Sequence, residues 1–225
     1  MKDITYINVL LDRSGSMSSV REETVSGLNH FIAEQKSVGD NATLTLAQFD
    51  LHDGCDITYT YENKPIAEVA PITLNQYEPR GSTPLLEALI KTIDSTGRVL
   101  GAIPEAKRPD KVVFVIITDG QENASQREYS KERVKLLIEQ QEKSYNWRFL
   151  YLGANVDTFD EAAAMGISAG MAASWAATPQ GMHKMMNVNS AKLGTYRKSG
   201  RAADLVYDSA EREEMMDDQN ETPIT

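Results

Sequence analysis

An almost uninterrupted apolar run of strand length lies in the middle of the chain, at residues 111–118 (Lys-Val-Val-Phe-Val-Ile-Ile-Thr). A strand with so few polar side chains must be covered on both faces, as the central strands of parallel sheets are when helices pack on both sides. Residues 4–11 form a second uncharged run that is rich in Ile, Val and Leu. The two runs are followed by Asp119 and Asp12, so the pattern predicts a buried parallel sheet with a carboxylate at the end of each of these strands.

The rest of the chain alternates between segments of strand and helix periodicity. Further strands are predicted at residues 42–49, 56–62, 147–152 and 172–177, and helices at about 20–38, 84–93, 130–143, 158–165 and 179–197. A short turn-rich link joins the second and third strands, which are therefore expected to form a hairpin. This order predicts an α/β fold, a doubly wound (Rossmann-like), mostly parallel sheet with one antiparallel edge strand and helices on both faces.

The formal net charge of -10 is unevenly distributed over the 225 residues. The residues from Asp204 onward carry eight acidic side chains and one basic side chain, so they contribute -7 of this charge. Because the hydrophobic pattern also fades there, we expect a globular domain at residues 1–199 and an acidic, flexible tail at residues 200–225.

Composition excludes several classes of function. An acidic chain lacks the basic surface that nucleic acid binding requires, so no nucleic acid partner is expected. No apolar run is long enough to cross a bilayer and no secretory signal is recognised, so we expect a soluble cytoplasmic protein without a membrane partner. The single cysteine, Cys55, excludes an internal disulfide and a cysteine-based zinc cage.

Three predicted loops carry oxygen-bearing side chains to one rim of the sheet. The first loop has Asp12, Ser14 and Ser16, the second has Thr83, and the third has Asp119. In open α/β sheets this rim is where ligands bind. Two carboxylates held close together repel one another, and a divalent cation removes that cost. Hard oxygen ligands of low total charge suit Mg²⁺, so the sequence predicts a magnesium site.

Some residues near these loops have simpler explanations. Thr83 precedes Pro84 and is expected to cap a helix whose first residue is that proline. Glu122 and Asn123 are expected to be solvated residues at the rim that could touch a partner. Asp50, His52 and Asp53 have the composition of a metal cluster, but a turn between the hairpin strands explains them better.

In these residues the chain resembles the von Willebrand factor A (vWA) domains and their metal-ion-dependent adhesion site (MIDAS). The family motif is Asp-x-Ser-x-Ser on the first loop, a Thr on the second and an Asp on the third. The sequence matches it in order at five positions, which are Asp12, Ser14, Ser16, Thr83 and Asp119. The sequence Asp-x-Ser-Gly-Ser-Met is similar to that of intracellular, prokaryotic or phage members. The resemblance extends over roughly residues 3–198.

The resemblance implies metal-dependent protein binding without turnover. Ser14 and Ser16 would bind Mg²⁺, with Mn²⁺ or Ca²⁺ as substitutes, Asp12 and Asp119 would bind directly or through water, and a partner protein would offer a Glu or Asp. One alternative is an Mg²⁺-dependent phosphatase or phosphotransferase that uses Asp12 as its nucleophile. That chemistry usually needs a second acid two residues on, where this chain has Ser14. A second alternative is a structural assembly subunit with a vestigial site, and the oligomeric state stays open.

Overall fold

The protein is described by a computed structural model that covers residues 4–52, 55–154 and 157–218. Its sheet consists of β1 (Thr5–Asp12), β2 (Ala42–Leu51), β3 (Cys55–Pro65), β4 (Lys111–Thr118), β5 (Arg148–Gly153) and β6 (Ala172–Ser174). The strand order is β3-β2-β1-β4-β5-β6. Only the hairpin pair β2 and β3 is antiparallel, while the other neighbouring pairs are parallel. The predicted fold class is therefore confirmed, including the antiparallel edge strand.

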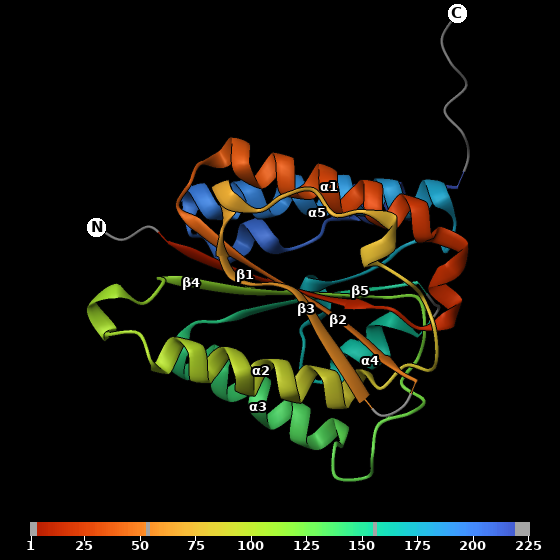
Figure 1. Cartoon of the computed structure of the whole chain (residues 1–225), viewed down its shortest axis with the longest axis horizontal. Coiled ribbons are helices and arrows are strands. Elements are labelled where there is room, and N and C mark those ends of the chain that lie inside the picture. Colours follow the sequence, from red (N-terminus) through yellow and green to blue (C-terminus); the bar gives the residue numbers. More distant parts are fainter. Residues whose placement is uncertain (1–3, 53–54, 155–156, 219–225) are drawn as a thin grey trace, which may run out of the picture.

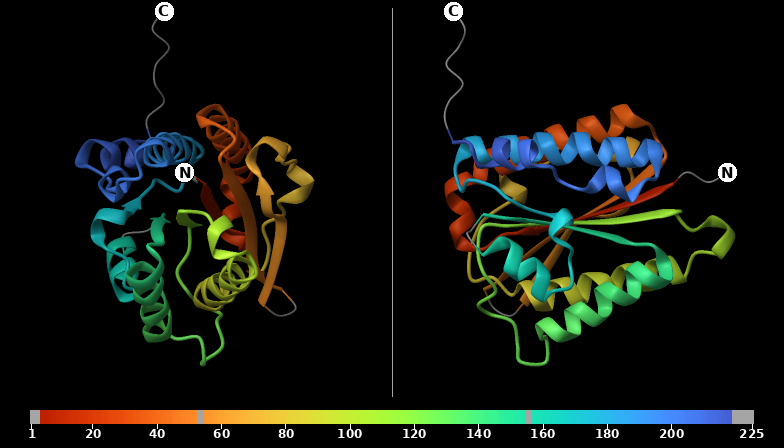
Figure 2. Two further views of the ribbon diagram at one scale, coloured as in Figure 1. Left: turned by 90° about the vertical axis from the view of Figure 1, so that its left-hand side faces the viewer. Right: turned by 180° about the vertical axis from the view of Figure 1, so that it is seen from behind.

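Helices cover both faces of this sheet (Figures 1 and 2). One face carries α1 (Arg21–Val38), α5 (Pro179–Ser199) and α6 (Ser209–Met216). The other carries α2 (Leu85–Gly101), α3 (Lys131–Tyr145) and α4 (Thr158–Ala164). No helix of the described residues is both long enough and apolar enough to span a membrane.

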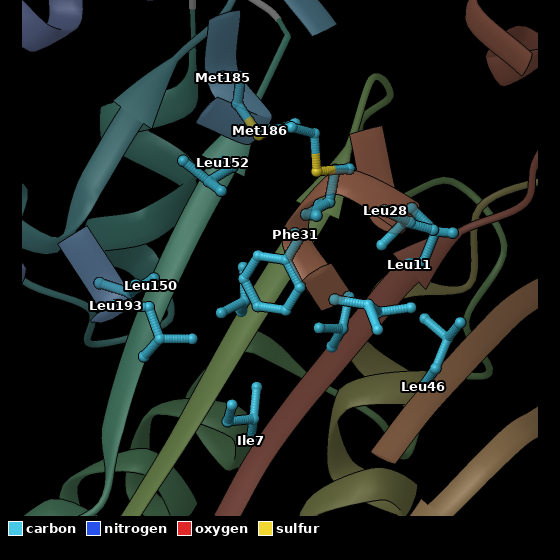
Figure 3. Close-up of a cluster of buried hydrophobic side chains, with 14 of the residues drawn as sticks. Ile7, Leu11, Leu28, Phe31, Leu46, Leu150, Leu152, Met185, Met186 and Leu193 are labelled. Atoms are coloured by element: carbon cyan, nitrogen blue, oxygen red, sulfur yellow. The ribbon is translucent and has the colours of Figure 1, made fainter. Parts of the chain in front are cut away.

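The central strand β4 divides its side chains between two cores. Val113, Val115 and Ile117 pack on the face of α1 and α5, whereas Phe114 and its even-numbered neighbours pack on the face of α2 and α3. Successive side chains of a strand point to opposite faces, so an uninterrupted apolar run is what a strand between two helical layers needs. In the core below α1 and α5, drawn in Figure 3, Phe31 and Met186 lie between Leu28 of α1 and Leu152 of β5.

Helices α1 and α5 lie unusually close to each other at one glycine. A Cβ placed on Gly27 of α1 would lie 2.6 Å from a side-chain carbon of Met186 on α5. That distance is shorter than van der Waals contact, so a larger residue at this position would force Met186 or the helix that carries it to shift. The methionines of α5 fill the core here.

The expectation of a flexible tail does not hold for the described residues after Ser199. Residues 202–205 form a 3₁₀ helix and α6 follows. Leu205, Tyr207 and Met215 are buried in the core of α1 and α5. The sequence did not reveal this segment, because its acidic side chains lie mostly on the outer side and its three buried residues follow no regular period. A usable local signal was the capping box of α6, in which Asp208 and Glu211 each bind the other's backbone N–H.

Two other segments differ in detail from the predictions. The last strand is shorter than expected, because only Ala172–Ser174 pairs with β5. The stretch at residues 63–80, between the predicted strand at 56–62 and the predicted helix at 84–93, begins with the end of β3 and contains two 3₁₀ turns, Ile66–Glu68 and Leu74–Gln76. It is fastened to α1 by Asn29, whose amide side chain exchanges two hydrogen bonds with the backbone of Ile72, at 2.9 and 2.7 Å.

Candidate metal centre

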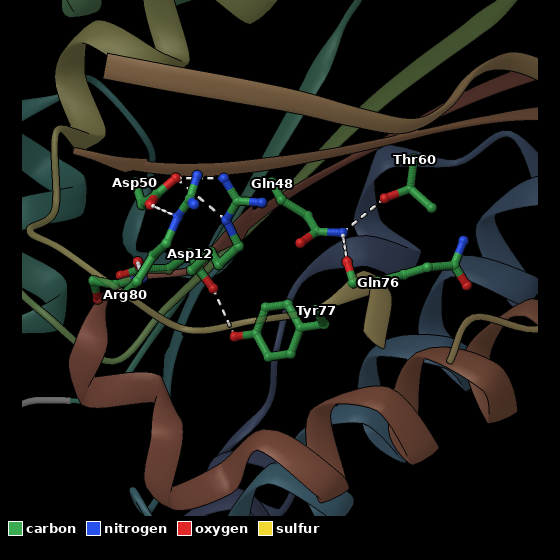
Figure 4. A network of polar contacts seen from close by, with 9 residues as sticks. Asp12, Gln48, Asp50, Thr60, Gln76, Tyr77 and Arg80 are labelled. Carbon is green, nitrogen blue, oxygen red and sulfur yellow. Dashed lines mark hydrogen bonds and ion pairs between the residues drawn. The ribbon is translucent and has the colours of Figure 1, made fainter. Parts of the chain in front are cut away.

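The first loop of the candidate site begins at the carboxyl end of β1. Asp12 is the last residue of that strand and is fully buried. Its Oδ1 accepts the backbone N–H of Ser14 at 2.7 Å, and its Oδ2 accepts the hydroxyl of Thr118, the last residue of β4, at 2.6 Å. The backbone carbonyl of Asp12 accepts the hydroxyl of Tyr77 at 2.7 Å (Figure 4). The carboxylate is thus held at one position between two neighbouring strands.

A chain of hydroxyl groups links the first loop to the third. The hydroxyls of Ser14 and Ser16 lie 3.1 Å apart. Ser16 donates a 2.7 Å hydrogen bond to Oδ1 of Asp119, which follows β4 directly. Ser16 is exposed, whereas Ser14 is 2% exposed. The structure therefore brings four of the five predicted residues into one hydrogen-bonded cluster.

Thr83, the fifth residue, lies against the same cluster. A Cβ placed on Gly120 would lie 3.3 Å from Oγ1 of Thr83 and 3.9 Å from Oγ of Ser16, so both hydroxyls flank this glycine. Thr83 is not the N-cap of α2 as the sequence predicted, because the helix begins at Leu85 and the N-cap position is Pro84. The Thr83 hydroxyl is therefore not used to cap the helix.

The start of α2 is capped instead by the loop that follows Asp119. Glu122 accepts the backbone N–H of Leu86 at 2.8 Å, and the hydroxyl of Ser125 accepts that of Glu87 at 3.0 Å. The side chain of Asn123 accepts the backbone N–H of Thr83 at 2.9 Å. Glu122 is thus half-buried rather than solvated. Local sequence patterns could not reveal these contacts, because the partners lie 36 to 40 residues apart along the chain.

Both carboxylates of the cluster are in surroundings that disfavour their charge. Burial raises the pKa of Asp12 to about 6, although hydrogen bonds from Thr118 and Ser14 lower it. Burial also raises the pKa of Asp119, against the effect of its hydrogen bond from Ser16. A cation bound between these groups would offset the cost of burying two negative charges. The donor set therefore fits a small, hard divalent cation.

The alternative cluster around Asp50 is not arranged as a metal site. Asp50 is fully buried and forms ion pairs with Arg13 and Arg80. Figure 4 shows Asp50 beside Arg80. His52 is exposed, and Asp53 lies outside the described residues. Within the described part of the chain, no group of three or more His, Cys, Asp and Glu side chains is placed to hold a metal ion. The candidate site differs from such groups because three of its five side chains are hydroxyls.

Comparisons with known proteins identify similar folds among solved structures. No family model and no curated protein match this sequence. Proximal thread matrix protein 1 from the mussel byssus is similar with a TM-score of 0.57 and 14% identity over 84% of this chain and 48% of that one. The same mussel protein with a zinc-occupied MIDAS motif gives a TM-score of 0.52 and 15% identity over 85% of this chain and 46% of that one. The VWA domain of SpRpn10 gives a TM-score of 0.51 and 10% identity over 82% of this chain and 94% of that one.

This chain thus spans about half the length of the mussel protein and most of the SpRpn10 domain. At these identities the similarity concerns the fold, and the sheet topology agrees with it. The chain therefore has the fold of a von Willebrand factor A domain.

Proposed function

We propose that this chain is a metal-dependent protein-binding module, in which a divalent cation at the rim of the sheet recruits an acidic residue of a partner protein. The observation that carries the proposal is the cluster in which Ser16 joins the first loop to Asp119. Ser14 and Ser16 would hold the cation through their hydroxyls. Asp12 and Asp119 would hold it directly or through water, and Thr83 would complete the set. The cation would supply a positive centre for a Glu or Asp of the partner.

The chemistry of the donors supports Mg²⁺ as the resident ion, with Mn²⁺ or Ca²⁺ as substitutes. Magnesium prefers oxygen ligands and keeps several bound waters, which hydroxyl groups and partly shared carboxylates tolerate. The zinc-occupied MIDAS of the mussel protein supports a divalent ion in this fold. The net charge of -10 favours a protein partner over nucleic acid, and a cytoplasmic protein of prokaryotic or phage type is part of the same proposal.

We propose binding rather than catalysis for this site. A phosphoryl-transferring enzyme with Asp12 as nucleophile would need a basic side chain directed at the phosphate. Arg13, next to Asp12 in sequence, has its guanidinium within 2.5 Å of the Asp50 carboxylate, where it is 7% exposed. Protein incubated with Mg²⁺ and p-nitrophenyl phosphate is therefore expected to release no nitrophenol above the level of an Asp12→Asn control. Release that depends on Asp12 would contradict the proposal.

A thermal melt with and without Mg²⁺ tests the metal site. An ion that binds only the folded protein stabilises it by about 2.7 kcal/mol at a hundred times its Kd. For a chain of this size, that corresponds to a rise in melting temperature of roughly 5–10 °C. Wild-type protein treated with EDTA and then given Mg²⁺ or Mn²⁺ is expected to show this rise.

Two exposed serines of one 3₁₀ turn provide a matched pair for the same melt. Ser16→Ala removes the hydroxyl that contacts both Ser14 and Asp119. Ser19→Ala removes a hydroxyl whose hydrogen bond goes only to the backbone of residue 16, at 3.3 Å. We expect the rise to shrink or vanish in Ser16→Ala and to persist in Ser19→Ala. Equal responses of the two variants, or no response of the wild type, would refute the assignment of the ligands.

A further inference from the structure

Asp50 of β2 is a fully buried carboxylate that binds two arginines. Its Oδ1 accepts hydrogen bonds from Arg13, at 2.5 Å from a terminal guanidinium nitrogen and 3.2 Å from Nε. Its Oδ2 accepts Nε–H of Arg80 at 2.8 Å. Both oxygens of a single carboxylate are therefore used to bind side chains from two different loops (Figure 4).

The two arginines belong to the loops that carry the predicted metal ligands. Arg13 lies between Asp12 and Ser14, and Arg80 lies three residues before Thr83. Their backbones are also joined, since the N–H of Arg80 donates to the carbonyl of Arg13 at 2.7 Å. Asp50 thus fixes the distance between the first loop, which carries Asp12, Ser14 and Ser16, and the segment that carries Thr83.

Backbone contacts around Gly81 extend this connection. The N–H of Gly15 donates to the carbonyl of Gly81 at 3.1 Å, and Ser82 exchanges two backbone hydrogen bonds with Leu51, the last residue of β2. Gly81 has a φ of +65°, and a Cβ there would lie 2.1 Å from the carbonyl oxygen of Leu51. No residue with a side chain fits this position, so glycine is needed for the backbone of residue 81 to approach that of Leu51.

The carboxylate of Asp50 also offsets the positive charge of the two arginines. Arg13 is nearly fully buried, so its charge is poorly screened by water and salt. Without Asp50, the buried guanidinium of Arg13 would lack this negative partner next to a site proposed to hold a cation. A buried charge that loses its partner is strongly unfavourable, and the loop would shift to expose it.

We infer that Asp50 is a positioning residue of the metal site, which through Arg13 and Arg80 holds the motif loop against the Thr83 segment. This inference rests on the proposed metal-binding function. Asp50 contacts no metal ligand through its own side chain and acts through the two arginines. Groups that orient metal ligands affect metal affinity by about 10- to 100-fold.

The test compares Mn²⁺ affinity, measured by electron paramagnetic resonance, in wild type and Asp50→Asn. The variant is expected to bind Mn²⁺ about 10- to 100-fold more weakly. Because Asp50→Asn also uncovers positive charge and could fail to fold, Arg80→Lys is the second variant. It retains the charge but loses the fixed guanidinium geometry, and Arg and Lys are not equivalent at such a contact. A loss of affinity in Arg80→Lys is therefore not caused by a change in net charge.

Arg197→Lys is the matched control. Arg197 is 1% exposed and binds backbone carbonyls of Gln35 and Gly39 at the opposite end of the sheet. The Arg197→Lys substitution is expected to lower the melting temperature without changing Mn²⁺ affinity. A purely structural role of Asp50 predicts that Arg80→Lys behaves like this control, and that result would overturn the inference.

Hydrogen exchange of the metal-free protein separates this inference from the proposed function. The amides of Gly15 and Arg80 are expected to exchange faster in Arg80→Lys than in wild type, and to be unaffected in Arg197→Lys. Unchanged exchange together with unchanged Mn²⁺ affinity would overturn the role of Asp50 while leaving the metal site intact. A wild-type protein that binds no Mn²⁺ would overturn the proposed function and, with it, the metal role assigned to Asp50, whatever the exchange rates.

Discussion

Asp12→Asn is expected to abolish both the stabilisation by Mg²⁺ and the binding of an acidic partner. The substitution removes one of the two carboxylates of the candidate site but keeps the shape of the side chain. An amide can still accept the N–H of Ser14 and donate to the hydroxyl of Thr118. Without metal, the variant is expected to melt at the same temperature as wild type or higher, because a buried negative charge has been removed.

The measurement is a pair of melting curves with EDTA and with Mg²⁺ for each protein. Wild type should show the rise in melting temperature described above, and Asp12→Asn should show none. Asp157→Asn is the control, since Asp157 is exposed and accepts a hydrogen bond from the side chain of Gln121, which is not one of the proposed ligands. It should respond to Mg²⁺ as wild type does. An Asp12→Asn protein that is stabilised by Mg²⁺ to the wild-type extent would refute the placement of the site.

Truncation of the chain after Ser199 is expected to have the largest effect on stability. It removes three side chains that are buried in the core of α1 and α5, Leu205, Tyr207 and Met215. Full burial of a large apolar side chain contributes about 1.5–3 kcal/mol, so the loss of three is roughly 4.5–9 kcal/mol. Domains are stable by only about 5–15 kcal/mol in total. The truncated protein is therefore expected to melt at least about 10 °C below the full chain, or without a cooperative transition.

Polar contacts of the same segment add to this loss. The buried side chain of Lys192 on α5 pairs with Glu211 at 2.8 Å and donates to the carbonyl of Val206 at 2.9 Å. The backbone N–H of Ala176 donates to the carbonyl of Met215 at 3.0 Å. Truncation leaves these groups without their partners.

A chain that ends after residue 218 is the control for the truncation. It retains all the described contacts of the C-terminal segment, and its melting temperature is expected to match that of the full chain. Differential scanning calorimetry of the two truncated proteins and the full chain makes the comparison. If the protein ending at Ser199 were as stable as the full chain, the domain boundary predicted at residue 199 would be correct.

The fold could be predicted from the sequence because its strands carry a strong local signal. The apolar runs before Asp12 and Asp119 could be covered only by helices on both sides, and the amphipathic segments between the strands supplied those helices. The C-terminal segment could not be predicted in the same way. Its buried residues are few and irregularly spaced, and the acidic side chains between them resemble those of an unstructured chain.

The meeting of the five candidate residues at one rim could also be predicted, because each of them follows a strand or precedes a helix in a recognisable pattern. The supporting residues could not. Glu122 caps a helix that begins 37 residues earlier. Asp50 lies at the end of a neighbouring strand, where a turn was the expected explanation for it. Glu122 also accepts hydrogen bonds from its own loop. Its contact with α2, and the contacts of Asp50 with Arg13 and Arg80, join separate elements and leave no periodic pattern in the sequence.

The sequence by itself determined the α/β class, the antiparallel edge strand and the five residues that meet at the rim. These depend on periodicity and on residues at strand ends, which are local properties of the chain. Only the tertiary structure decided that Asp50 joins two loops, that Thr83 does not cap α2, and that the segment after Ser199 adds Leu205, Tyr207 and Met215 to the core. Each of these depends on which distant groups satisfy a buried charge, a backbone N–H or an apolar surface, and that choice is made only when the whole chain packs.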